Sequence, residues 1–199
     1  MQNSLDLGFA EPVLQSQASF RAIMDALANP GIIQKLVTPV SAPAPLGTAL
    51  AIVALTLCDH DTSIWLDAEL AASQAVRDFI GFHTGTPIVT EAGKAQFAFA
   101  TSASTLPRLD QFNLGTQEYP DRSTTVVLRV ESLTGGPELI SRGPGIKDHG
   151  HFAPVGLPED FLAQWMDNRE LFPRGIDLLL VADGQVMGLP RSTRLSEGH

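Results

Sequence analysis

The stretch from Ile176 to Leu189 constrains the fold more than any other part of the chain. Its first half, Ile176 to Val181, is apolar at every position except Asp177, as is typical of a strand that is covered on both faces. Asp183-Gly184 then signals a tight hairpin turn, and Gln185 to Leu189 continues as a second strand. A hairpin adds an antiparallel neighbour to such a strand, so we expect a mixed sheet.

Apolar spacing predicts the helices. Phe20, Ile23, Met24 and Leu27 recur at i, i+3, i+4 and i+7, which predicts a helix from Ser16 to Ala28 with these four residues on its buried side. Asn29-Pro30-Gly31 ends it. Further helices are expected at Leu46 to Leu57, at Ala68 to Phe82 with Val76, Phe79 and Ile80 inward, and at Glu159 to Leu171, opened by Pro158, with Phe161, Leu162 and Trp165 inward.

Short β-branched or alternating segments predict the remaining strands. They are Ile32 to Val37, Thr62 to Leu66, Lys94 to Thr101, Thr124 to Val130 and Glu138 to Ser141. The three prolines of the loop Thr38 to Pro45 do not mark a domain boundary, since neither flanking piece could close a core alone. We therefore expect residues 1–199 to form one three-layer α/β domain, a mixed sheet flanked by helices.

The composition of the chain excludes some classes of binding partner. The formal net charge of −9 leaves no basic face for a nucleic-acid backbone, so DNA and RNA are not expected partners. The charged fraction of 18% lies below the roughly 25% of ordinary domains, which favours an oligomer. No apolar run approaches the roughly 18 residues of a membrane span, and the N-terminus resembles no signal peptide. Cys58 lies in an apolar run and has no disulfide partner. A cytoplasmic protein without membrane contact is expected.

Motifs for self-contained catalysis are weak. Gly143-Pro144-Gly145-Ile146-Lys147 follows a strand, as a phosphate-binding loop would. It has neither the G-x-x-x-x-G-K-[ST] nor the G-x-G-x-x-G spacing of such loops, so a simple turn is favoured over an anion-binding loop. Asp59-His60-Asp61 and Asp148-His149-Gly150-His151 contain metal-ligand residue types but no complete set, so no metal is expected. Serine and cysteine nucleophile motifs are missing, and no lysine has a cofactor-binding context, so we expect no cofactor.

Arginines at loop ends remain as candidates. Arg142 and Lys147 flank the glycine loop, and Arg174, Arg191 and Arg194 lie close to the ends of the two hairpin strands. If those strands pair, Arg174 and Arg191 leave the same sheet edge and could bind an anion such as ATP or a phosphonate. The alternative is structural, since Arg174 follows a helix C-terminus and Asp177 is an available ion-pair partner. Both readings stay open, and no catalytic residue can be named.

Five short motifs occur together in one order. They are Phe20-Arg21 through Pro30-Gly31, Gly115 to Ser123 with Pro120, Gly143-Pro144-Gly145-Ile146, Phe172 to Asp177 and Leu189-Pro190-Arg191. In this order, over roughly Gln15 to Leu195, the chain resembles the PhnH family, the H subunit of the bacterial carbon-phosphorus lyase core complex.

The resemblance implies a function. Family members join the G, I and J subunits in phosphonate catabolism, where the G, H and I subunits support exchange of the adenine of ATP for alkylphosphonate. The product is ribose 1-alkylphosphonate 5-triphosphate. The resemblance also implies a homodimer, and a mixed-sheet fold distantly similar to pyridoxal-phosphate transferases without the cofactor lysine. Two hypotheses follow, a subunit that positions its partners or one that also binds the anionic substrate. An independent metal-dependent enzyme is a third, remote alternative.

Overall fold

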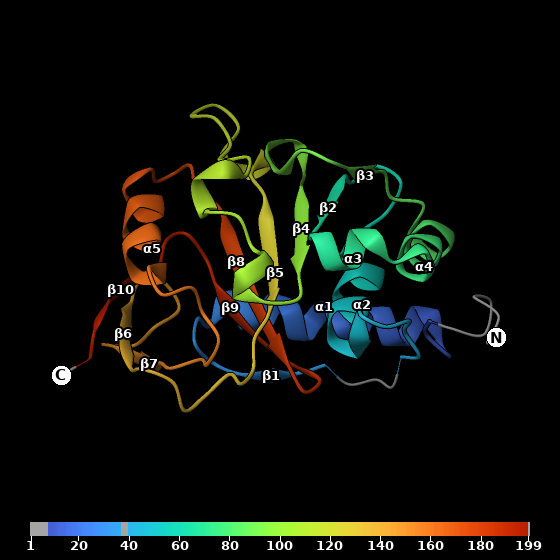
Figure 1. Cartoon of the computed structure of the whole chain (residues 1–199). Helices are drawn as coiled ribbons and strands as arrows, with labels where there is room; N and C mark the ends of the chain where they lie inside the picture. Colours follow the sequence, from blue (N-terminus) through green and yellow to red (C-terminus); the bar gives the residue numbers. More distant parts are fainter. Residues whose placement is uncertain (1–7, 37–39, 199) are drawn as a thin grey trace.

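A seven-stranded mixed sheet lies at the centre of the computed structural model, which describes residues 8–36 and 40–198 (Figure 1). The strand order is β1-β9-β8-β5-β4-β2-β3. The five strands from β8 to β3 run parallel to one another, whereas β9 is antiparallel to both β8 and β1. The predicted hairpin therefore forms, and the sheet is mixed as expected.

The bounds of the elements are as follows. The helices are α1 (Pro12–Ala28), α2 (Gly47–Leu57), α3 (Ala68–Ala72), α4 (Gln74–Thr84) and α5 (Phe161–Glu170). The strands are β1 (Gln34–Lys35), β2 (Ile64–Leu66), β3 (Ile88–Val89), β4 (Phe97–Ala100), β5 (Thr125–Arg129), β6 (Leu139–Arg142), β7 (Gly150–Phe152), β8 (Asp177–Ala182), β9 (Gln185–Leu189) and β10 (Arg194–Glu197). None of the helices in the described ranges is long and apolar enough to cross a membrane.

Two hydrophobic cores cover the two faces of this sheet. Along β8, Leu179 and Val181 belong to the core beneath α1, α2 and α4, whereas Leu178 and Leu180 belong to the core beneath α5. All four side chains are fully buried, which is the alternation that a strand between two layers requires. The apolar composition of this strand is therefore explained by burial on both sides.

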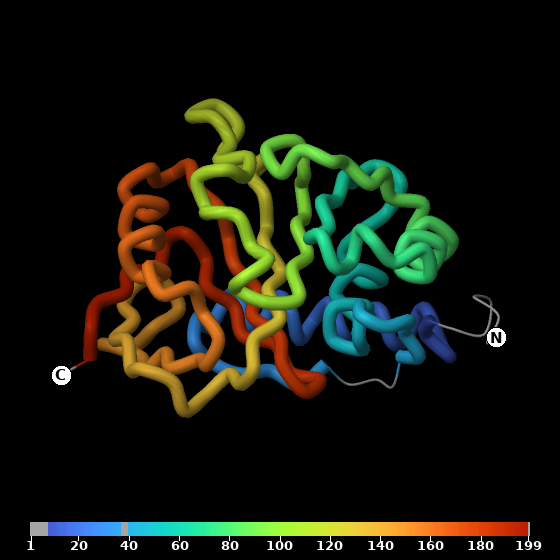
Figure 2. Tube along the Cα trace, in the orientation of Figure 1, coloured from blue at the N-terminus to red at the C-terminus, as the bar shows by residue number. Residues whose placement is uncertain are grey.

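A second, three-stranded antiparallel sheet stands beside α5, in the order β10-β6-β7. In Figure 2 the last part of the chain, in red, leaves the central sheet after β9 and ends next to β6. The indole nitrogen of Trp165 on α5 donates to the Thr193 carbonyl at 3.0 Å. The small sheet and α5 thus complete the layer on this face of the central sheet.

The buried side of α1 differs from the prediction. Ile23 is buried as expected, but Phe20 and Met24 are about half exposed, and Ser19 and Ala26 are buried instead. The cause is close packing, since a Cβ atom added to Gly188 of β9 would lie 2.6 Å from the Ala26 carbonyl oxygen. Such an approach leaves room only for small side chains, and the larger ones turn outward.

Other differences concern boundaries. The helix predicted from Ala68 to Phe82 is two helices, because Ser73 ends α3 and its hydroxyl accepts from Val76 N at the start of α4. Pro158 lies before the cap of α5, Asp160, and not in its first turn. Of the strand Ile32 to Val37 only β1 forms, and Val37 to Pro39 lie outside the described residues. Strands β3, β7 and β10 were not predicted.

Candidate functional site

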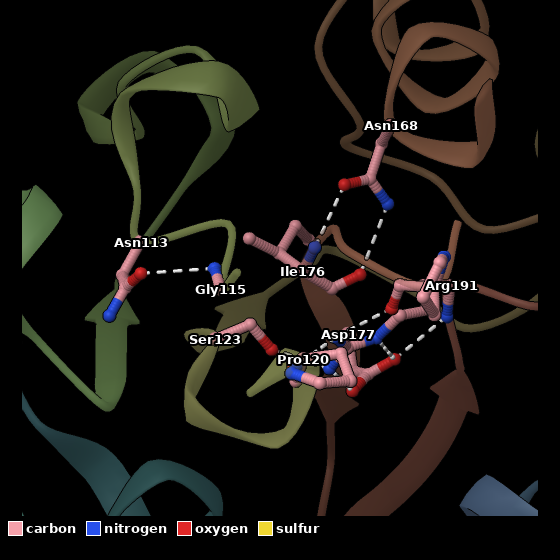
Figure 3. A network of polar contacts seen from close by, with 9 residues as sticks. Asn113, Gly115, Pro120, Ser123, Asn168, Ile176, Asp177 and Arg191 are labelled. Atoms are coloured by element: carbon pink, nitrogen blue, oxygen red, sulfur yellow. Dashed lines mark hydrogen bonds and ion pairs between the residues drawn. The ribbon is translucent and has the colours of Figure 1, made fainter. Parts of the chain in front are cut away.

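Arg191 is the centre of a polar network at the open end of the β8–β9 hairpin (Figure 3). Its Nε donates to Asp177 Oδ1 at 3.1 Å, and its two Nη atoms donate to Asp177 Oδ2, Ser123 Oγ and the carbonyls of Pro120 and Pro173. A guanidinium has five N–H groups, and all five have acceptors within the protein. The side chain is only 13% exposed, so this network is largely shielded from water.

The hairpin creates this arrangement. Asp177 begins β8 and Arg191 follows β9, so antiparallel pairing brings the two residues to the same sheet end, where Arg191 N also donates to Asp177 Oδ1 at 2.7 Å. Arg191 therefore clamps the hairpin to the segment that precedes β5. With every donor engaged, its guanidinium has none left for an anion in this conformation.

The neighbouring segments are fixed by two asparagines that the sequence reasoning did not single out. Asn168 on α5 exchanges two hydrogen bonds with Ile176, at 2.8 and 3.1 Å, and Asn113 Oδ1 accepts from Gly115 N at 3.0 Å (Figure 3). Asn168 is buried, and its amide satisfies the main chain just before β8. These contacts position the loop ends around Arg191.

The glycine loop after β6 is a turn, not an anion cradle. Ile146 N donates to the Gly143 carbonyl at 3.2 Å, which closes the turn. A Cβ atom on Gly145 would overlap the Ala28 carbonyl oxygen at the end of α1, and one on Gly143 would lie 3.1 Å from the Ser192 carbonyl oxygen. These glycines therefore allow close packing against α1 and the segment after β9. Lys147 lies exposed just beyond the turn.

Arg174 does not pair with Asp177, which corrects the ion pair considered from sequence. The Asp177 carboxylate is taken by Arg191. Arg174 N donates to the Leu171 carbonyl at 3.0 Å, whereas its side-chain Nε is buried without a hydrogen-bond partner among the described residues. Arg191 Nη1 reaches the carbonyl of the adjacent Pro173 at 3.4 Å. The pairing of β8 with β9 therefore places Arg174 and Arg191 in neighbouring segments, but only Arg191 forms an ion pair with the Asp177 carboxylate.

Arg142 and Arg194 form a different pair. Strands β6 and β10 are antiparallel, and their register sets Arg194 directly opposite Arg142. Both side chains are exposed, and neither has an ion pair or hydrogen bond within the described part of the chain. They border two adjoining hollows between α5 and the small sheet, of about 340 and 750 Å³, which share Met166 and Leu195. The hollows lie within the size range of small-molecule sites.

A second polar network closes the carboxyl ends of β2 and β4 and was missed from sequence. Asp67 Oδ2 accepts from Thr101 N at 2.7 Å, Thr101 Oγ1 at 2.7 Å and Thr105 Oγ1 at 2.6 Å, while Asp67 Oδ1 accepts from Leu70 N at 2.8 Å. Burial raises the pKa of Asp67, but these hydrogen bonds together outweigh burial and hold the pKa below its ordinary value.

The position of this network is informative. The connection from β2 to β3 contains α3 and α4 and lies on one face of the sheet. The connection from β4 to β5 lies on the opposite face, where its residues Leu109 and Phe112 are buried. Open α/β sheets bind ligands where the connections diverge in this way. Here the place is filled by hydrogen bonds between Asp67 and its own chain, which join the start of α3 to the end of β4.

The remaining candidate groups are dispersed. Cys58 is buried, and burial, with the nearby Asp59 carboxylate, raises the pKa of its thiol to about 12, which excludes it as a thiolate nucleophile at neutral pH. His151 Nδ1 lies 2.6 Å from Glu138 Oε1, and the rings of His149 and His151 are 5.6 Å apart. Over residues 8–36 and 40–198 no cluster of three or more His, Cys, Asp or Glu residues could hold a metal ion.

Comparison with known proteins places this geometry in a family. A family model described as "Bacterial phosphonate metabolism protein (PhnH)" matches residues 7–196. The chain is 54% identical over 187 residues to the alpha-D-ribose 1-methylphosphonate 5-triphosphate synthase subunit PhnH of Rhizobium meliloti (strain 1021), covering 94% of this chain and 93% of that protein. The chain belongs to the PhnH family. It is also 30% identical over 182 residues, covering 92% of this chain and 86% of the relative, to HtxG of Stutzerimonas stutzeri, provisionally named a C-P lyase subunit protein.

Within the PhnH fold, four of the five motifs that carried the resemblance prove to be packing elements, whereas Phe20 and Arg21 at the start of the remaining one are exposed on α1. The segments around Pro120, Asp177 and Arg191 meet in the Arg191 network, Gly145 packs on the end of α1, and Gly143 packs on the segment after β9. The resemblance was therefore detected through residues that build the fold. The exposed Arg142 and Arg194 lie outside this network, on the surface of the small sheet.

Proposed function

We propose that this chain is a non-catalytic subunit of a carbon-phosphorus lyase system, in which it supports exchange of the adenine of ATP for alkylphosphonate. The product of that exchange is ribose 1-alkylphosphonate 5-triphosphate. The observation that carries the proposal is the 54% identity, over nearly the full length of both chains, to a subunit of a synthase named for ribose 1-methylphosphonate 5-triphosphate. The chain acts in the cytoplasm together with the G, I and J subunits.

The role of the chain is to position its partners. Two groups that could act as nucleophile or base are engaged inside the fold, since Cys58 is buried as a thiol and Asp67 accepts four hydrogen bonds. Docking of a rigid subunit can fix the geometry of a neighbouring active site, and a misplacement of about 1 Å can cost on the order of 100-fold in rate.

Exposed apolar side chains support association with other chains. Val13 and Leu14 on α1 are 68% and 64% exposed, and Phe20 and Met24 on the same helix are about half exposed. These exposed apolar side chains and the low charged fraction of 18% both favour a protein whose surface is partly covered by other subunits. We include a symmetric homodimer in the proposal, with an isologous interface.

A second candidate function is substrate binding by this subunit itself. The observation that favours it is the unneutralised pair Arg142 and Arg194 beside the hollows along α5. This function would add an anion site to the positioning role and would not replace it.

Co-purification tests the proposal. This chain would be co-expressed with the G, I and J subunits of its own operon, with an affinity tag on the I subunit. Stoichiometric recovery of the chain in one complex, and a mass near twice 21.3 kDa for the chain alone, are expected. Recovery of the tagged subunits free of this chain at every salt concentration would contradict the proposal.

A further inference from the structure

Arg142 and Arg194 form an unusual cross-strand pair on the outer surface of the small sheet. Directly opposite residues of antiparallel strands point to the same face, with Cβ atoms roughly 5 Å apart, and like charges in this position destabilise the pairing. The register of β10 on β6 imposes this arrangement, because Leu195 opposite Ser141 is the buried pair and the arginine pair must then face outward. Two positive charges are therefore held side by side without a carboxylate on either one.

The hollows beside the pair combine an apolar floor with further charge. The floor consists of Ile140, Leu162, Met166 and Leu195. Arg169 on α5 lines the smaller hollow, and its Nε is buried without a hydrogen-bond partner within the described ranges, while its guanidinium lies 4.9 Å from the centre of the Phe172 ring. Three arginines against the two lining carboxylates, Glu170 and Glu197, leave a local positive excess in a chain of net charge −9.

The chemistry of these groups selects a phosphate ester with an apolar end. Guanidinium groups match phosphate oxygens with paired, charge-assisted hydrogen bonds, and two adjacent ones suit a chain of phosphates better than a single carboxylate. The apolar floor suits a flat ring system. Unlike Arg191, whose five N–H groups are all engaged, Arg142 and Arg194 keep their donors available.

We propose that the groove between α5 and the small sheet binds the triphosphate of a nucleotide or ribosyl triphosphate through Arg142 and Arg194, with the base or sugar against Ile140 and Met166. This inference rests on the proposed function, and it identifies the substrate class and the place at which this subunit would take it. Arg174, Arg191 and Lys147 have no part in the site.

Calorimetry on the purified full-length chain tests the inference with ATP, inorganic tripolyphosphate and adenosine as probes. We expect ATP and tripolyphosphate to bind with dissociation constants below about 1 mM, and adenosine more weakly. Arg142→Gln and Arg194→Gln should each weaken ATP binding on the order of 10-fold or more, the effect of removing a charge-assisted hydrogen bond. Arg21→Gln, which removes an exposed arginine on α1, is the matched control and should change nothing.

Folding of the variants is checked by thermal unfolding. Because each substitution removes a like-charge repulsion, neither should lower the melting temperature, so a loss of binding cannot be attributed to misfolding. Absence of heat with both ATP and tripolyphosphate, or equal affinity in the Arg142→Gln/Arg194→Gln double variant, would overturn the inference.

Partner binding separates this inference from the proposed function. If the double variant still co-purifies with the G, I and J subunits and supports the transfer fully, the groove does not bind substrate but the subunit role stands. If the double variant loses its partners while the wild-type chain binds no triphosphate, the arginines contact an acidic segment of a partner, and the substrate site is wrong.

Discussion

The carboxylate of Asp177 binds Arg191 twice over, through the main-chain N–H as well as through the guanidinium. Asp177 begins β8 and Arg191 follows β9, so their contact closes the hairpin at its open end. The same guanidinium then reaches Ser123 and the Pro120 carbonyl before β5. A single side chain thereby joins three segments that are up to 71 residues apart.

Arg191→Ala should lower the free energy of unfolding by about 3 kcal/mol, because it leaves the largely shielded Asp177 carboxylate without its positive partner and two carbonyl groups without their donor. Urea denaturation followed by tryptophan fluorescence measures this value. Arg194→Ala, three residues further on and exposed, should stay within about 0.5 kcal/mol of the wild type. Equal losses in the two variants would contradict the structural role of Arg191.

Gly145→Ala should destabilise the chain by about 3 kcal/mol through two effects. The positive φ of +79° disfavours alanine by about 1 kcal/mol, and the new methyl group would overlap the Ala28 carbonyl oxygen. Gly135→Ala is the control, since Gly135 also has a positive φ, of +91°, but has nothing within 4 Å of the added carbon. Similar denaturation midpoints for both variants would show that the loop does not pack on α1.

Asp67 should make the free energy of unfolding depend on pH in the acidic range. Its pKa is lower in the folded chain than in the unfolded chain, so the folded state is stabilised above the unfolded value of about 3.9 and this gain is lost as the pH falls through the folded value. Asp67→Asn should be less stable than the wild type at pH 7 by about 1–3 kcal/mol.

The difference in stability between Asp67→Asn and the wild type should narrow as the pH falls below about 4, as urea midpoints at several pH values would show. Thr105→Val removes one of the donors to Asp67 and should give an intermediate dependence on pH. A stability difference that does not change as the pH falls would contradict a lowered pKa of Asp67 in the folded chain.

Cys58 should resist alkylation in the folded chain. Because burial raises the pKa of its thiol to about 12, the thiolate fraction at pH 8 is small and the sulfur is shielded from reagent. Mass spectrometry after iodoacetamide treatment should find the native chain unmodified and the urea-unfolded chain fully modified. Rapid modification of the native chain would show that the core around α2 opens readily.

Much of the central sheet could be predicted because its signals are local. The apolar β8 and the Asp183-Gly184 turn lie next to each other in sequence, and their pairing needs no distant information. The orientation of α1 could not be predicted from its apolar spacing, since the close approach of Gly188 to Ala26 decides which side faces the sheet. Strand β10 has a single buried residue, Leu195, and so shows no apolar alternation.

The candidate sites depend on long-range pairing and were predictable only in part. Arg142 and Arg194 could be chosen as arginines at loop ends, but their juxtaposition follows from the register of β10 on β6. Asp67 could have been recognised as a helix cap from its place before Ala68-Glu69-Leu70. Its bonds to Thr101, 34 residues away, require the parallel pairing of β2 with β4.

Release of adenine from ATP in the presence of methylphosphonate tests the central claim most directly. We expect none from this chain alone, a slow or misdirected reaction from the I and G subunits, and efficient formation of the ribosyl phosphonate when this chain is added to them. Chromatography of the products with and without the chain distinguishes these cases. Adenine release by the isolated chain, or an unchanged product profile when it is added to the I and G subunits, would contradict the account.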